Sequence, residues 1–207
     1  MAHTPAGTLL GTLVSRTDMS GAIRAAAVLF IAALTAAAAQ VSVQLPFTPV
    51  PLTLQPMVVL LGGAALGARL GMASQVLYLC AGMAGLPVFA PSAVLLPGVW
   101  RLIGPTGGYL LSYPLAAFAT GWLAERGFDR RYITSVLAMT AGLAIVFTFG
   151  VTWLALFARP AALGFPAALE AGFYAFLPVD VYKILVAATI LPAVWRFTGI
   201  RNVNPEP

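Results

Sequence analysis

Two opposite charges, three residues apart in an apolar segment, are the part of the sequence best suited to chemistry. Asp180 and Lys183 lie in the stretch 174–195, YAFLPVDVYKILVAATILPAVW, and no other charged residue falls between Glu170 and Arg196. Charged groups are costly in lipid, so in membrane proteins they face a protein interior or a watery cavity and mark ligand or ion paths. The i, i+3 spacing predicts that both side chains share one helical face.

This charged pair has two interpretations. Asp180 and Lys183 could neutralise each other as a structural ion pair, or they could anchor a bound solute, and one pair can do both. Pro178, two residues before the aspartate, is typical of a helix start. A position in the first helical turn would also favour the Asp180 carboxylate through the helix dipole.

A few neutral groups add hydrogen-bonding capacity. Gln55 could contact a ligand or satisfy a helix end. Tyr78 and Tyr109 offer hydroxyls and flat faces, which an interfacial aromatic belt would explain equally well. The stretch 104–109, GPTGGY, lacks the Lys-Ser/Thr ending of a phosphate-binding loop. It is either a tight turn with close backbone packing or a direct ligand contact.

The sequence contains no pattern of residues that is typical of an enzyme active site. The chain has one histidine and one cysteine, and no pattern of these with carboxylates matches a metal site or a Ser-His catalytic arrangement. We therefore expect no catalytic residues, no metal and no cofactor. Nothing in the sequence resembles a nucleotide site either, so we do not expect the chain itself to hydrolyse ATP.

The composition indicates an integral membrane protein. Of 207 residues, 60% are hydrophobic and 8% charged, and the mean hydropathy is +0.94. A soluble domain could not hide so much apolar surface. The net charge of +5 could suggest a nucleic-acid partner in a soluble protein, but here the basic residues lie between apolar segments and indicate topology instead. We expect no nucleic-acid partner.

The apolar segments predict an all-α fold, an integral membrane bundle of six transmembrane helices. A spanning helix needs about 20 largely apolar residues. The predicted segments are Ala22 to Gln40, Leu54 to Leu66, Leu70 to Leu86, Gly107 to Ala124, Ile133 to Phe157 and Phe173 to Trp195. The second and third are short and separated by GARLG, so they form a tight hairpin or one is tilted or incomplete. The membrane domain is predicted at 21–198, between cytoplasmic tails at 1–20 and 199–207.

The basic residues predict the orientation, since short cytoplasmic loops carry an excess of Lys and Arg. Eight of them fall on one side of the predicted bundle: Arg16, Arg24, Arg69, Arg126, Arg130, Arg131, Arg196 and Arg201. The loops of the other side hold only Arg101 and Arg159. Both termini are therefore predicted to be cytoplasmic, in a multi-pass protein of the cell (inner) membrane.

This orientation predicts three outer connections, at 41–53, 87–106 and 158–172. The first has three prolines and no charge, so it should be stiff and extended, more like a lid or plug than a flexible linker. Asp180 would lie near the outer end of the last helix. Arg101, Asp180 and Lys183 could then converge at one depth in the outer half of the bundle.

The first predicted helix carries small residues at helical spacing. Ala32 and Ala36, and also Ala33 and Ala37, form small-xxx-small pairs, which let another helix approach closely in a membrane. The other helix could belong to a partner or to the bundle itself. The sequence has no evident internal repeat, which counts against a self-contained carrier built from inverted repeats.

Four blocks, in order, resemble the signature blocks of the BioY family, the biotin-binding S components of energy-coupling factor (ECF) transporters. They are FTPVPLTLQP (47–56), YLCAGMAGLPVFA (78–90), GPTGGYLLSYPLAAF (104–118) and DVYK (180–183). The resemblance covers almost the whole membrane part. It implies a six-helix vitamin-capturing subunit that binds its substrate near the outer surface, beneath the first outer loop.

The resemblance also implies partners and site residues. The family works with a transmembrane coupling protein and a pair of ATP-binding-cassette (ABC) ATPases, and the coupling protein would dock on Ala32 and Ala36. The substrate-binding residues implied by the resemblance are Gln55, Arg101, Asp180 and Lys183, beside the candidate hydroxyls of Tyr78 and Tyr109.

Biotin itself suggests how these groups would be used. Asp180 could accept hydrogen bonds from the ureido N–H groups, while Lys183 or Gln55 donates to the ureido carbonyl. Arg101 would suit the carboxylate through a bidentate pair. Other functions stay open: a biotin carrier without an ATPase module, a carrier driven by an ion gradient, an S component for another small vitamin, or a scaffold that transports nothing.

Overall fold

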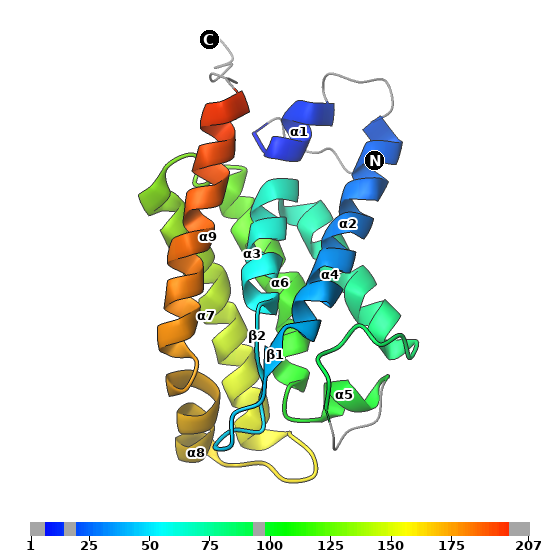
Figure 1. Ribbon diagram of the computed structural model, residues 1–207, viewed down its shortest axis with the longest axis vertical. Coiled ribbons are helices and arrows are strands. Elements are labelled where there is room, and N and C mark those ends of the chain that lie inside the picture. The colour runs from blue at the N-terminus through cyan, green and yellow to red at the C-terminus, as the bar shows by residue number, and fades with distance from the viewer. Residues whose placement is uncertain (1–6, 15–19, 93–97, 199–207) are drawn as a thin grey trace.

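The protein is a bundle of helices capped at one end by a short β-hairpin (Figure 1). The computed structural model describes residues 7–14, 20–92 and 98–198. The helices are α1 (Leu9–Val14), α2 (Ser20–Gln40), α3 (Gln55–Leu66), α4 (Ala68–Met83), α5 (Trp100–Ile103), α6 (Gly107–Ala124), α7 (Tyr132–Leu156), α8 (Phe165–Leu169), the π-helical segment η1 (Glu170–Tyr174) and α9 (Leu177–Thr198). The strands are β1 (Ser42–Val43) and β2 (Leu52–Thr53).

Each predicted apolar segment forms a helix, namely α2, α3, α4, α6, α7 or α9. Within the part of the chain that the structure describes, three stretches are long and apolar enough to cross a membrane: Gly21–Gln40, Tyr132–Leu156 and Phe165–Phe197. The tight hairpin between α3 and α4 is confirmed, because Gly67 alone separates the two helices. Its φ of 87° lies in the left-handed region, which glycine adopts without a steric penalty.

Helix α6 lies at the centre of the bundle and packs against α3, α4 and α7. Glycines let these helices approach closely, as small residues do in membrane proteins. A Cβ on Gly63 would meet the backbone of Ala117 in α6, and a Cβ on Gly71 would meet Gly63 itself. Larger side chains fill the core around them, including the fully buried Leu60 and Leu154.

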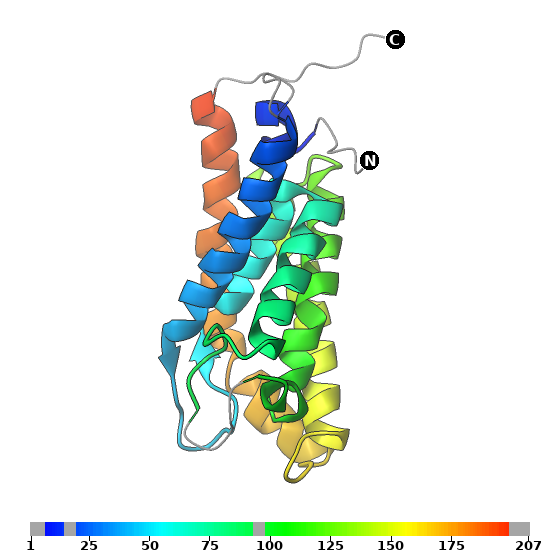
Figure 2. The ribbon, with the colours of Figure 1, turned by 90° about the vertical axis from the view of Figure 1, so that its right-hand side faces the viewer.

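The two ends of the bundle differ. Helix α1, the end of α9 and the turn between α6 and α7 lie at one end, while the hairpin, α5 and α8 lie at the other (Figures 1 and 2). Part of the predicted N-terminal tail is helical, since α1 spans Leu9–Val14. Leu10 of α1 is buried against Ile31 and Leu66. Residues 1–6, 15–19 and 199–207 of the predicted tails lie outside the described residues.

The connection between α2 and α3, residues 41–53, is called the lid here. Its strands pair in antiparallel fashion with Ser42 opposite Thr53. The segment between the strands, residues 44–51, carries the three prolines and consists of turns and bends, so the extended form is limited to the strands. The lid is tied down on two sides. Thr48 Oγ1 donates to the Ala171 carbonyl of η1 at 2.7 Å, and Gln44 Nε2 donates to the Pro91 carbonyl at 3.2 Å.

Candidate ligand-binding cavity beneath the lid

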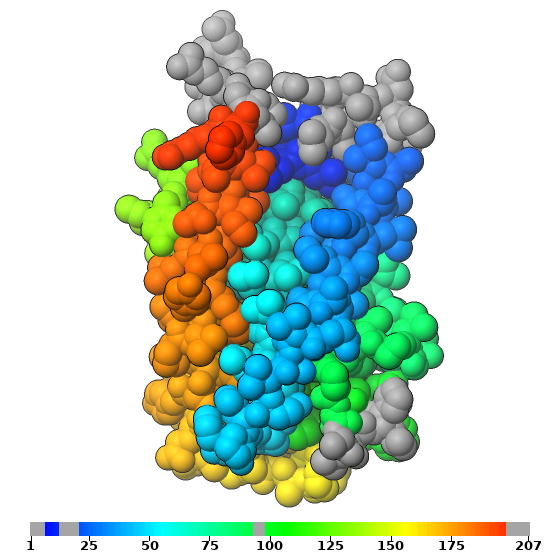
Figure 3. Space-filling view, viewed as in Figure 1, coloured from blue at the N-terminus to red at the C-terminus, as the bar shows by residue number. Residues whose placement is uncertain are grey.

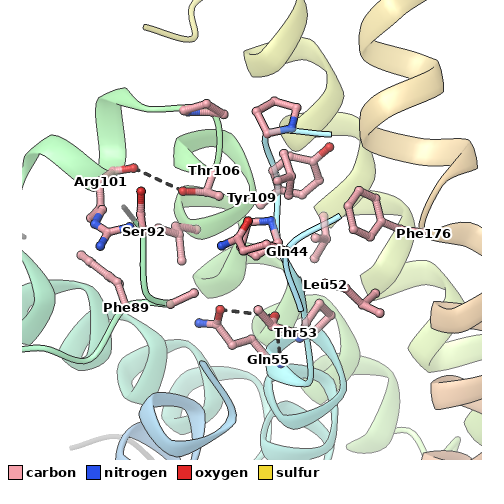
Figure 4. Close-up of a pocket in the computed structure, with 18 of the residues that line it drawn as sticks. Gln44, Leu52, Thr53, Gln55, Phe89, Ser92, Arg101, Thr106, Tyr109 and Phe176 are labelled. Carbon is pink, nitrogen blue, oxygen red and sulfur yellow. Dashed lines mark hydrogen bonds between the residues drawn. The ribbon is translucent and has the colours of Figure 1, made fainter. Parts of the chain in front are cut away.

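A cavity of about 410 Å³ lies beneath the lid, within the size range of pockets that enclose small ligands. In Figure 3 the lid, in light blue, covers this end of the bundle between α9 and the region of α5. Apolar and aromatic side chains supply much of the wall: Val50, Leu52, Phe89, Leu110, Tyr113, Val146, Phe147 and Phe176. A few polar groups join them, as Figure 4 shows for Gln55 and Arg101.

Asp180 and Lys183 form an ion pair at the wall of this cavity. Asp180 lies in the first turn of α9, one turn before Lys183, and Pro178 occupies the helix start as predicted. Lys183 Nζ donates to Asp180 Oδ1 at 2.7 Å and to the Thr53 carbonyl at 2.6 Å. Both charged side chains are buried, at 5% and 7% exposed, and both line the cavity.

Both interpretations of the charged pair therefore fit the geometry. The two groups neutralise each other, and they also face a space that can hold a solute. Both groups keep hydrogen-bonding capacity for a ligand. Asp180 Oδ2 accepts no hydrogen bond from the described residues. Lys183 uses two of its three N–H donors.

Gln55 lines the cavity from the start of α3. Its Nε2 donates to the Tyr78 hydroxyl at 2.6 Å, and its Oε1 accepts from the Thr53 hydroxyl at 3.4 Å. Tyr78 lies behind Gln55, is 1% exposed, and is not among the cavity-lining residues. Its ring packs edge-on against Phe89 and its hydroxyl donates to the Val88 carbonyl. The structure thus makes Tyr78 a support for Gln55, where the sequence predicted a ligand contact.

Tyr109 and Arg101 both line the cavity. The Tyr109 hydroxyl donates to the Gly172 carbonyl of η1 at 2.8 Å. Arg101 belongs to α5, and Figure 4 shows it beside Ser92, across the cavity from Phe176. Its Nε is buried with no hydrogen-bond partner among the described residues, and burial lowers the pKa of the guanidinium from its usual value.

The glycine-rich stretch 104–109 packs closely against its neighbours and also contributes residues to the cavity wall. A Cβ on Gly107 would collide with the Leu102 backbone, and one on Gly108 would collide with Trp153. Close packing therefore requires glycine at these positions. Pro105, Thr106 and Tyr109, from the same stretch, line the cavity.

Sequence reasoning missed several residues of the cavity wall. Gln44, Thr53, Tyr113 and Phe176 gave no signal that separates them from packing residues. From the sequence, Arg159 contributes only to the predicted topology, yet this residue also lines the cavity. Its place in an apolar outer loop, on the side that holds few basic residues, was a signal that could have identified it.

The alanine stripe of α2 faces differently from the prediction. Ala32 is 8% exposed and Ala36 is half-buried, and both pack in the bundle core. Ala33 and Ala37 are exposed. Ala32 therefore leaves little surface for a partner, while Ala36 is half-buried, and docking of a partner on these two residues stays a prediction.

The fold and the site together define a helical membrane protein with a solute-sized cavity at one end. The sequence profile of the BioY family matches residues 11–199, and the chain belongs to this family. It is 40% identical to the probable biotin transporter BioY of Pyrococcus horikoshii over 78% of this chain and 89% of the relative. It is 35% identical to the biotin transporter BioY of Rhizobium etli, over 80% and 89% of the two chains.

A solved structure confirms the fold. The chain superimposes on the crystal structure of the S-component for biotin from an ECF-type ABC transporter with a TM-score of 0.76. The match covers 87% of this chain and 94% of the other, at 22% sequence identity.

Proposed function

We propose that the protein captures biotin at the outer face of the cell membrane, with high affinity, as the substrate-binding subunit of an ECF-type transporter. The observation that carries the proposal is a buried acid–base pair, Asp180 and Lys183, at the wall of a lidded cavity. Buried charges are costly and are kept where they serve a ligand or ion path. The family relationship makes biotin the solute that best fits this site.

In the proposed topology six helices span the membrane and the lid faces outward. Helix α1 and the end of α9 lie at one end of the bundle, opposite the lid (Figure 1). The basic residues Arg126, Arg130 and Arg131, between α6 and α7, lie at the same end as α1. This arrangement fits the positive-inside rule with both termini in the cytoplasm.

The proposed pose places the ureido ring of biotin against Asp180, Lys183 and Gln55. The Asp180 carboxylate has an oxygen that can accept from the ureido N–H groups, and Lys183 has a donor for the ureido carbonyl. The apolar ring and chain of biotin would lie along aromatic side chains such as Phe176. The biotin carboxylate would reach Arg101, whose buried Nε has no partner among the described residues.

A competition experiment tests the proposed substrate. Purified protein in detergent should bind labelled biotin, and an excess of unlabelled biotin should displace the label. Thiamine and riboflavin should leave it in place, because neither presents a ureido ring with an aliphatic carboxylate. Displacement by one of these vitamins instead would identify an S component for another vitamin. Failure to bind any of the three would refute vitamin capture.

The proposed partners are a transmembrane coupling protein and ABC ATPases, which would supply the energy that this chain has no nucleotide motif to supply. The exposed face of α2, with Ala33 and Ala37, is the accessible small-residue surface for docking. An Ala37→Trp variant should bind biotin normally and lose co-purification with the coupling protein. Leu137→Trp, at an exposed position of α7, is the matched control.

Two results would change this proposal, one on the docking face and one on the mode of transport. Co-purification of Ala37→Trp with the coupling protein at wild-type levels would rule out this docking face. Biotin uptake by cells that lack every coupling protein would instead favour a stand-alone carrier.

A further inference from the structure

Arg159 shares the rim of the cavity with Arg101, although the two lie far apart in sequence. Both line the cavity. The Arg159 backbone N–H donates to the Ile103 carbonyl at 3.0 Å, so its main chain is fixed to the end of α5, two residues from Arg101. Trp153 Nε1 donates to the Gly104 carbonyl at 2.9 Å, which ties the end of α7 to the same segment.

The charges around the cavity are unequal. Among the described lining residues Asp180 is acidic, while Arg101, Arg159 and Lys183 are basic, which leaves two positive charges in excess. Lys183 and Asp180 already pair with each other. The side chains of Arg101 and Arg159 form no salt bridge or hydrogen bond with another described residue. The rim therefore carries two cations whose counter-charge must come from elsewhere.

We propose that Arg159 is a second carboxylate-binding residue, which works with Arg101 to bind the ionised carboxylate of the ligand and to select acids over their neutral derivatives. The inference rests on the proposed function and assigns a role to a residue outside the predicted site. Guanidinium groups stay charged, present several donors and match the geometry of a carboxylate. Arg159 is exposed, so its contribution should include attraction of the anion from solution, which salt weakens.

The test is a cycle in which the ligand charge and the arginine are removed in turn. Affinities for biotin and for biotinamide, its neutral amide, are measured at low salt for the wild type and for Arg159→Gln. The variant should bind biotin roughly tenfold more weakly than the wild type, which corresponds to the lower end of the range for a hydrogen bond to a charged group. It should bind biotinamide as tightly as the wild type does. Arg159→Lys should recover part of the loss, because it restores the charge without the planar guanidinium.

Arg196→Gln removes an exposed arginine at the far end of α9 and is the matched control, with no expected effect. Equal biotin affinity of Arg159→Gln and wild type, or equal losses for biotin and biotinamide, would overturn the assignment of Arg159. Such results would leave biotin binding itself intact. Failure of the wild type to bind biotin would overturn the proposed function and this inference with it.

Discussion

Asp180 and Asp129 are buried carboxylates near opposite ends of the bundle, and they are satisfied in different ways. Asp180 pairs with Lys183 and lines the cavity. Asp129, which is 1% exposed, precedes α7 and is not among the cavity-lining residues. Its Oδ2 accepts from Trp195 Nε1 at 2.7 Å, and its Oδ1 has no hydrogen-bond partner among the described residues.

Under the proposed function, Asp180 is a buried carboxyl that serves a ligand, whereas Asp129 is one that serves packing. Asp180 has a matched cation and faces the adjoining cavity, where a solute can reach it. Asp129 instead holds the end of α9 against the turn between α6 and α7. The Arg130 guanidinium lies 4.8 Å from the centre of the Trp195 ring and adds to this contact.

The largest expected effect on stability comes from removing one partner of the Asp180–Lys183 ion pair. Lys183→Met should destabilise the folded protein by about 3–5 kcal/mol, because it leaves a buried carboxylate without its cation. The Asp180→Asn, Lys183→Met double variant should regain much of this stability, since neither charge remains. Thermal unfolding in detergent measures both variants.

The double variant also distinguishes the two roles of the pair. It should fail to bind biotin even though it folds, because the groups that contact the ureido ring are gone. Binding of biotin at wild-type affinity by the double variant would mean that the pair is purely structural.

A smaller effect is expected at the lid. Thr48→Val keeps the shape of the side chain and removes the hydrogen bond from Thr48 Oγ1 to the Ala171 carbonyl. A loss of about 1 kcal/mol should make biotin dissociate roughly fivefold faster. Thr189→Val is the matched control, because the Thr189 hydroxyl donates to the Val186 carbonyl of the same helix, at an exposed position away from the lid. Equal dissociation rates for Thr48→Val and wild type would show that this contact does not hold the lid closed.

The comparison with Asp129 is tested through the dependence of stability on pH. Burial raises the pKa of Asp129 from 3.8 to about 6, while the hydrogen bond from Trp195 and the charge of Arg130 oppose the shift. The folded protein therefore holds this proton more tightly than the unfolded chain does. The stabilisation is fully present below about 3.8 and is lost as pH rises through about 6.

The free energy of unfolding should accordingly fall with rising pH across this window, and Asp129→Asn should flatten the fall. Unfolding temperatures measured at several pH values check this prediction. An unchanged slope in the variant would assign the pH dependence to other groups.

The long helices α2, α7 and α9 were predictable because each has an apolar run of sufficient length, and the glycine between the shorter helices α3 and α4 marks their turn. The short elements α5, α8 and η1 were not, because contacts distant in sequence help to hold them. The bond from Arg159 to Ile103 fixes the end of α5, and the bond from Thr48 to Ala171 fixes η1. Such bonds join residues that no local pattern connects.

The site was predictable where a residue type is rare in a membrane segment. Asp180 and Lys183 drew attention for that reason. Arg101 was identified instead as a charge in an apolar outer loop and through the family resemblance, and all three residues line the cavity. The rotational setting of α2 was not predictable, because alanines occur on both of its faces and apolarity alone cannot tell the lipid side from the core. Tyr78 shows the same difficulty, since whether a tyrosine lines a cavity or supports its wall depends on tertiary packing.

The measurement that tests the account most directly is a calorimetric titration of biotin into the wild type, Asp180→Asn and Asp129→Asn in detergent. Wild type and Asp129→Asn should bind with equal affinity, because Asp129 lies outside the cavity. Asp180→Asn should lose about 1.5–3 kcal/mol of binding free energy, the range for a hydrogen bond to a charged group. Equal affinity of all three proteins for biotin would contradict the claim that the buried acid of the cavity holds the ligand.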